Sequence, residues 1–178
     1  MQKFHVLLIL FFSSAISQAQ DEPRLTGKAW ADMDYGPAMK FSVQVSEDNI
    51  AYKGLAVRLD PGPGGIASGN TFMVFDTDTL RWAGGWTSDT FIDWRGIAMN
   101  GEHEIHPSVT GDVLFTNPVA PGWGHPIDGR FTDERVEGRD GKRYGPMARD
   151  WGRWNGHYLQ GDKVVLSYTI GGTEILET

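Results

Sequence analysis

The stretch from Phe72 to Trp86 constrains the fold more than any other part of this sequence. Two short runs rich in aromatic and aliphatic residues flank the polar residues 76–79, which read Asp-Thr-Asp-Thr. This pattern predicts a β-hairpin, with a strand on each side of a short polar loop. Asp76 and Asp78 suit such a loop because a short carboxylate accepts a hydrogen bond from the backbone two residues further on.

Both faces of the first strand of this hairpin are apolar. Phe72 and Val74 fall on one face, whereas Met73 and Phe75 fall on the other. A strand that is apolar on both faces belongs in the middle of a sheet, with another layer on each side. We therefore expect this hairpin to lie at the centre of the fold.

The returning strand carries Leu80, Trp82 and Trp86, and simple alternation predicts that these three share one face. No part of the chain has helical periodicity, whereas alternating or β-branched runs indicate further strands. These are predicted at residues 41–46, 52–59, 91–95, 112–116, 163–170 and 173–178. The chain is therefore predicted to be all-β, with two packed antiparallel sheets in a sandwich and long irregular loops. Incomplete blades of a β-propeller are the alternative.

The N-terminus has the pattern of a secretory signal peptide over residues 1–19, with a basic start, an apolar run and Ala19 before the cleavage site. The apolar run is too short to cross a bilayer. Residues 20–31 are polar and unpatterned, which predicts a flexible arm. Residues 32–178 have the length of a single domain. We expect a periplasmic or secreted protein that has no membrane contact after cleavage.

Charge and cysteine content exclude several classes of function. The chain has a formal net charge of −7, which argues against nucleic acid and anionic membranes as partners. It has no cysteine, which excludes disulfides, thiolate metal sites and covalently attached haem. The fold must therefore be stabilised by packing alone.

Several motifs in this order resemble a domain family of unknown function, DUF6797, which occurs in exported bacterial proteins. They are Met-Asp-Tyr-Gly-Pro (33–37), Asn-Ile-Ala-Tyr-Lys-Gly-Leu-Ala-Val-Arg-Leu (49–59), Phe-Asp-Thr-Asp-Thr-Leu-Arg (75–81), Ala-Gly-Gly-Trp (83–86), His-Pro (106–107), Gly-Pro-Met-Ala-Arg-Asp-Trp (145–151) and Gly-Asp-Lys-Val-Val-Leu-Ser-Tyr-Thr-Ile-Gly-Gly-Thr-Glu-Ile-Leu-Glu (161–177). The resemblance runs from about Asp32 to Glu177.

In DUF6797 proteins the domain often precedes c-type haem modules and propellers that resemble sugar dehydrogenases. The resemblance therefore implies an oxidative or carbohydrate-related role, with haem or propeller modules as partners in the same or another chain. This sequence has no Cys-x-x-Cys-His motif and ends in mid-strand, so we expect a fragment whose redox function lies elsewhere. The resemblance supplies no catalytic residues.

The segment Glu102–His106 is the strongest candidate for a metal site in the sequence, because it combines two histidines with two carboxylates. His103 and His106 lie among carboxylates, and such a pair can hold a transition metal. The alternative is a polar loop whose histidines make ordinary hydrogen bonds. Because no third ligand is identifiable, the loop is favoured and we expect neither a metal nor another cofactor.

The tryptophans have two possible roles, because large aromatic rings both fill cores and stack on sugars. Charged residues near the same loops either form surface ion pairs or clamp a hydroxyl-rich ligand. No motif of a catalytic nucleophile is present. The candidate ligand-binding residues are Trp86, Trp94, Arg95, His103, His106, Trp123, Arg149 and Asp150.

These patterns favour an exported, non-catalytic accessory or ligand-binding domain, with carbohydrate as the ligand. Two other functions fit the same sequence. One is the N-terminal fragment of a periplasmic haem-containing oxidoreductase that acts on sugars. The other is a structural module that docks neighbouring domains.

Overall fold

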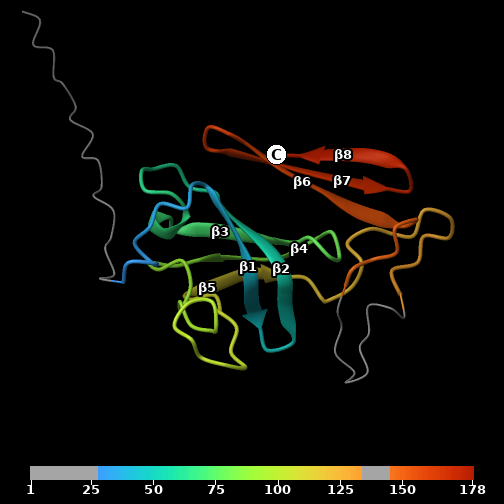
Figure 1. Ribbon diagram of the computed structural model, residues 1–178. Helices are drawn as coiled ribbons and strands as arrows, with labels where there is room; N and C mark the ends of the chain where they lie inside the picture. The colour runs from blue at the N-terminus through green and yellow to red at the C-terminus, as the bar shows by residue number, and fades with distance from the viewer. Residues whose placement is uncertain (1–27, 134–144) are drawn as a thin grey trace, which may run out of the picture.

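The computed structural model describes residues 28–133 and 145–178, which form eight β-strands and one turn of 3₁₀ helix (Figure 1). The predicted signal peptide and the charged stretch from Glu134 to Arg143 lie outside the described residues. The elements are β1 (Ala38–Ser46), β2 (Asn49–Arg58), η1 (Ile66–Ser68), β3 (Thr71–Asp76), β4 (Arg81–Thr87), β5 (Asp112–Thr116), β6 (Gly152–Gln160), β7 (Lys163–Ile170) and β8 (Thr173–Glu177).

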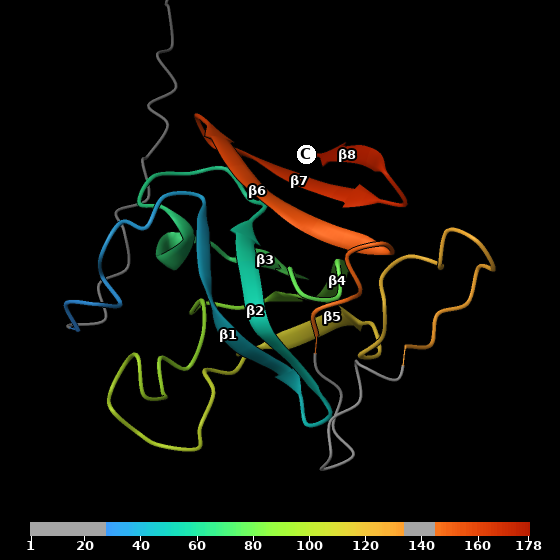
Figure 2. The same cartoon turned by 45° about the vertical axis from the view of Figure 1, so that its right-hand side comes forward.

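The strands form two antiparallel sheets, which confirms the predicted fold class. One sheet has the order β1-β2-β3-β4-β5 and the other the order β6-β7-β8. In Figures 1 and 2 the three-stranded sheet lies across one side of the five-stranded sheet. Every connection between neighbouring strands in these sheets joins strands that are consecutive in the chain, so both sheets are meanders. Within the described residues no helix is long and apolar enough to cross a membrane.

The hairpin of β3 and β4 lies at the centre of the larger sheet, as its two apolar faces predict. The side chain of Asp76 shapes the turn as expected. Its Oδ1 accepts a hydrogen bond from the backbone N–H of Asp78 at 3.1 Å, and its Oδ2 accepts one from the hydroxyl of Thr79 at 2.7 Å. Hydrogen bonds between neighbouring residues therefore fix the conformation of this turn.

A β-bulge in this hairpin contradicts the prediction that Trp82 and Trp86 share a face. The pairing slips between Val74 and Phe75, so that Val74 lies opposite Gly84 but Phe75 lies opposite Trp82. The extra residue reverses the alternation of β4. Trp86 consequently packs on one side of the sheet, whereas Trp82 packs on the other.

The five-stranded sheet is strongly curled, which brings β1 close to β4. A Cβ atom on Gly84 would lie 2.5 Å from the Cγ1 atom of Val45 and 3.0 Å from the carbonyl oxygen of Phe115. Real Cβ contacts are not this short, so glycine is required there for close approach. Figure 2 shows the curvature that results.

The first core, which we name the inner core, fills the side of the sheet away from β6–β8. Phe72, Val74 and Trp86 from the central hairpin pack there with Phe91 and Trp94. Residues 91–95 were predicted to form a strand, but only one isolated β-bridge forms, between residues 92 and 109. The segment instead turns inward at residue 94, where φ is 53°, and it covers the core with side chains rather than by strand pairing.

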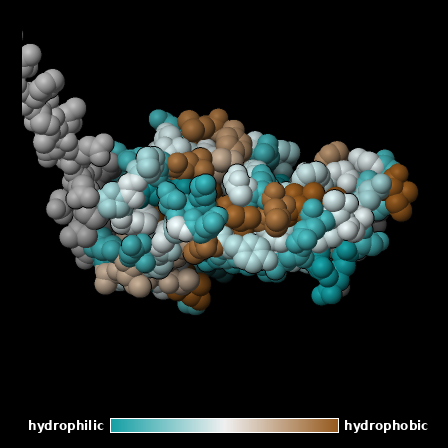
Figure 3. All heavy atoms as spheres, turned by 90° about the horizontal axis from the view of Figure 1, so that it is seen from above, coloured by the Kyte–Doolittle hydropathy of each residue, from teal (hydrophilic) through white to brown (hydrophobic). Residues whose placement is uncertain are grey.

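The second core, which we name the inter-sheet core, lies between the two sheets. Leu55 and Phe75 of the larger sheet meet Leu166 and Tyr168 of β7 there, together with Trp151 before β6. The alternation predicted for residues 163–170 is confirmed, because Leu166 and Tyr168 both face this core. Figure 3 looks down on the three-stranded sheet and shows apolar atoms in patches separated by polar ones.

Candidate binding cleft between the two sheets

Two of the predicted ligand-binding tryptophans are core residues. Trp86 has no exposed surface and Trp94 is 5% exposed. The indole N–H of Trp86 donates to the carbonyl oxygen of Phe91 at 3.0 Å, so its polar atom is also satisfied internally. A ring with no exposed face cannot stack on a ligand, and the core-packing alternative accounts for both side chains.

The candidates Arg95, His103 and His106 lie on one loop, which covers the inner core. Arg95 forms ion pairs at the surface, 3.3 Å from Glu102 and 3.9 Å from Asp93. His103 is exposed, and the Nδ1 atom of His106 lies 3.0 Å from the hydroxyl of Ser42. Among residues 28–133 and 145–178, no three side chains of the metal-binding types converge on one point.

The remaining candidates lie elsewhere in the fold. Arg149 and Asp150 are exposed in the turn that precedes β6. Trp123 is 38% exposed, and its ring centroid lies 6.0 Å from that of Tyr168. Of the eight predicted residues, Trp123 alone is among the described residues that line the cleft considered next.

A cleft of about 540 Å³ opens where the loop of residues 117–123 meets the two sheets. Its floor is aromatic and buried, with Phe75 from β3 and Tyr168 from β7. Trp82 from β4 also lines it, and the exposed rings of Trp123 and Phe131 stand at its rim. A concave site with aromatic walls and few polar groups is typical of small-molecule binding.

A carboxylate is held inside this aromatic cleft. The Oε1 atom of Glu177 accepts a hydrogen bond from the indole N–H of Trp82 at 2.7 Å. Its Oε2 atom accepts one from the hydroxyl of Tyr168 at 2.8 Å. Both oxygens are thereby oriented, and since a carboxylate has about four acceptor positions, roughly two remain for a ligand.

The phenol of Tyr168 stays protonated under ordinary conditions. Burial raises its pKa above the usual value, and the hydrogen bond to Glu177 and the negative charge of that residue raise it further. At neutral pH the phenol is therefore the donor in its hydrogen bond to Glu177.

The loop that forms one wall of the cleft is fixed to the hairpin by direct bonds. The side-chain amide of Asn117 donates to the carbonyl oxygen of Trp82 at 2.8 Å. At the other end of the loop, the indole of Trp151 donates to the carbonyl oxygen of Trp123 at 3.0 Å. Both ends of the wall are thus held in place, so the cleft is pre-formed.

Gly122 brings the same loop into close contact with the hairpin turn. Its N–H donates to the carbonyl oxygen of Thr79 at 2.7 Å. A Cβ atom at this position would lie 2.0 Å from the carbonyl oxygen of Leu80, which no side chain tolerates. The position of Trp123 therefore depends on glycine at the preceding residue.

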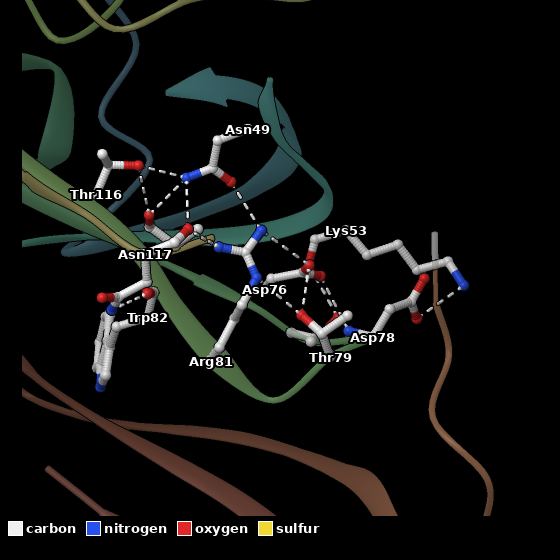
Figure 4. Close-up of polar contacts among 11 residues, drawn as sticks. Asn49, Lys53, Asp76, Asp78, Thr79, Arg81, Trp82, Thr116 and Asn117 are labelled. Carbon is white, nitrogen blue, oxygen red and sulfur yellow. Dashed lines mark hydrogen bonds and ion pairs between the residues drawn. The ribbon is translucent and has the colours of Figure 1, made fainter. Parts of the chain in front are cut away.

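A buried arginine is hydrogen-bonded to the loop that forms this wall (Figure 4). The guanidinium of Arg81 donates to the hydroxyl of Thr79, to the side-chain oxygen of Asn49 and to the carbonyl oxygen of Asn117. It also lies 3.7 Å from the carboxylate of Asp76. Burial raises the pKa of Asp76, while the charge of Arg81 acts in the opposite direction. The network links the wall of the cleft to the central hairpin.

A comparison with known protein families identifies the family of this chain. A family model described as a domain of unknown function, DUF6797, matches residues 73–177, more than half of the sequence. This chain belongs to the DUF6797 family. No curated protein and no solved structure matches it. The DUF6797 match begins within β3, so β1 and β2 precede it, whereas every described residue that lines the cleft lies inside it.

The prediction from sequence missed most of this DUF6797 cleft. The candidates did not include Trp82, Phe131, Tyr168 or Glu177. The sequence does contain one indication that Glu177 is special. Within β8, Glu177 shares the inward face with Ile175, and a charged residue at an inward strand position is unusual. Such a residue marks either an ion pair or a site.

Proposed function

We propose that this DUF6797 domain is a non-catalytic ligand-binding module of an exported protein and that its inter-sheet cleft binds a carbohydrate. The observation that carries the proposal is the combination of exposed rings at the rim, Trp123 and Phe131, with the oriented carboxylate of Glu177 inside. Aromatic rings stack on the apolar faces of sugars, and a carboxylate accepts hydrogen bonds from their hydroxyls.

The set of polar groups supports binding rather than cleavage. Hydrolysis of a glycosidic bond ordinarily uses two carboxyl groups on opposite sides of the bond. Among the described lining residues, Glu177 is the one acidic side chain, and it is already bonded to Trp82 and Tyr168. The apolar run and cleavage pattern of residues 1–19 support export.

Titration with soluble oligosaccharides tests the proposal. The protein is titrated with neutral oligomers of glucose, xylose, mannose and galactose while tryptophan fluorescence and heat are recorded. At least one oligomer should bind, and Trp123→Ala should weaken that binding by about 1–3 kcal/mol, as loss of a stacking ring does.

Tyr158→Ala provides the matched control. Tyr158 is an aromatic residue of β6 that is 60% exposed and does not line the cleft. Its removal should leave affinity unchanged. Equal losses in the two variants, or no binding by any oligomer, would contradict the proposed function.

A further inference from the structure

We infer that the cleft selects uncharged sugars over acidic ones and that Glu177 is the residue that determines this specificity. The inference rests on the proposed function and goes beyond it, because it names the class of sugar. It is carried by the charge balance inside the cleft.

The positive charge nearest the cleft is already neutralised. Arg81 is among the lining residues, but its side chain is only 4% exposed and lies 3.7 Å from the carboxylate of Asp76. Its N–H groups donate to protein oxygens, including the carbonyl oxygen of Asn117. Its charge is therefore paired with Asp76, and its burial leaves little of the guanidinium for an anionic ligand to contact.

Among the described residues, no positive charge compensates the negative charge of Glu177. Its two hydrogen bonds come from Trp82 and Tyr168, which are neutral groups, and no described cationic side chain forms an ion pair with it. Aromatic walls lower the local dielectric constant, which strengthens the field of this charge inside the cleft. The net charge of −7 over the whole chain acts in the same direction.

The chemistry of the carboxylate then separates two classes of sugar. A neutral sugar presents hydroxyl groups, which donate to the free acceptor positions of Glu177. A uronate or a sulfated sugar instead carries a negatively charged group that has lone pairs but no hydrogen to donate. Next to Glu177 this group is repelled by the carboxylate charge and cannot form a hydrogen bond with it. Juxtaposed like charges of this kind are an effective means of rejecting a wrong partner.

Glu177→Gln isolates the charge with little change in shape. The carbonyl oxygen of the glutamine can still accept from Trp82, and its amide can donate to the phenol oxygen of Tyr168. Glu174→Gln is the matched control, because Glu174 is an exposed residue of the same strand that does not line the cleft. It removes the same unit of charge from the protein outside the site.

The experiment measures affinity for paired oligomers of equal length, a neutral glucose or galactose oligomer and its C6-oxidised uronate counterpart. Wild-type protein and Glu174→Gln should bind the neutral oligomer at least about tenfold more tightly than the uronate. Glu177→Gln should reduce that ratio about tenfold or more, mainly through tighter binding of the uronate. Thermal melts of the variants check that each is folded.

The outcomes separate the two proposals. Equal or tighter binding of the uronate by wild-type protein would overturn the inference while leaving carbohydrate binding intact. The inference also fails if Glu177→Gln folds and retains the wild-type ratio. Absence of binding by both neutral and acidic oligomers would overturn the proposed function and the inference together.

Discussion

The inner core and the inter-sheet core are built from similar residues but differ in how they satisfy the polar atoms of their aromatic rings. In the inner core the indole of Trp86 donates to a backbone carbonyl within the same cluster. In the inter-sheet core the indole of Trp82 donates to Glu177 of β8, at the edge of an open cleft. The first arrangement closes a core, whereas the second holds a charged acceptor where a ligand can reach it.

This difference indicates that the two sides of the larger sheet have different roles. The inner core provides stability, because its rings are fully buried and its loops are packed on top of them. The inter-sheet core contributes stability through Phe75 and Leu166 but leaves rings exposed at its rim. Substitutions in the inner core should therefore mainly lower stability, whereas substitutions at the rim of the cleft should mainly weaken binding.

The largest expected effect is the loss of a ring from the inner core. Trp86→Ala should lower the free energy of unfolding by about 3–5 kcal/mol, because it removes a fully buried aromatic side chain. Trp123→Ala, at the rim of the cleft, should cost much less stability while it weakens binding. Urea denaturation of both variants checks this, and similar losses of stability would remove the distinction between the two cores.

The next effect concerns the curvature of the larger sheet. Gly84→Ala would place a methyl group 2.5 Å from Val45 and 3.0 Å from the carbonyl oxygen of Phe115. The sheet would have to flatten or Val45 would have to move, and such overpacking costs about 1–3 kcal/mol. A thermal melt measures it. A variant as stable as the wild type would show that close approach of β1 and β4 is not needed for the inner core.

A smaller effect should appear in the inter-sheet core at alkaline pH. The pKa of Tyr168 is raised by burial and by Glu177, so its contribution to stability is full below the unfolded pKa of about 10 and is lost as pH rises beyond it. Tyr168→Phe should lower the free energy of unfolding by about 1 kcal/mol at neutral pH, because it removes one hydrogen bond. It should also show a shallower decline in stability above pH ~10. Unfolding curves across this pH range, with tyrosinate absorbance, test both expectations, and identical pH profiles would contradict them.

The smallest effect concerns the loop between β2 and β3, whose Ile66 is buried in the inner core. Partial burial raises the pKa of Asp60, but hydrogen bonds from the backbone of Asn70 and Thr71 and from Arg58 outweigh it, so the pKa is lowered overall. The stability that Asp60 supplies is therefore present above its unfolded pKa of about 3.9 and is lost as pH falls through the lower folded value.

Asp60→Asn should consequently reduce stability at neutral pH by less than about 1 kcal/mol, since the ion pair is partly exposed. The difference from wild type should shrink in acid, and melts at several pH values between neutral and strongly acidic measure it. A difference that stays constant with pH would show that the carboxylate charge is not what holds the loop.

The sequence by itself determined the features of this protein that depend on neighbouring residues. Alternation within a strand is local, so it identified β1 and β7, and a run without proline or glycine identified β5. The two apolar faces of β3 likewise predicted the central position of the β3–β4 hairpin. Turn chemistry is equally local, and Asp76 behaves as predicted. The resemblance to DUF6797 was also carried by the sequence, and the family match bears it out over residues 73–177.

The tertiary structure decided the features that depend on residues far apart in the chain. A single bulge reversed the face of Trp86, and it forms because Trp82 and Trp86 pack into different cores. The bond between Trp82 and Glu177 joins residues 95 positions apart, so no local pattern reveals it. Packing of one sheet on the other therefore created the cleft, because it brings the end of β8, the β3–β4 hairpin and the loop of residues 117–123 together.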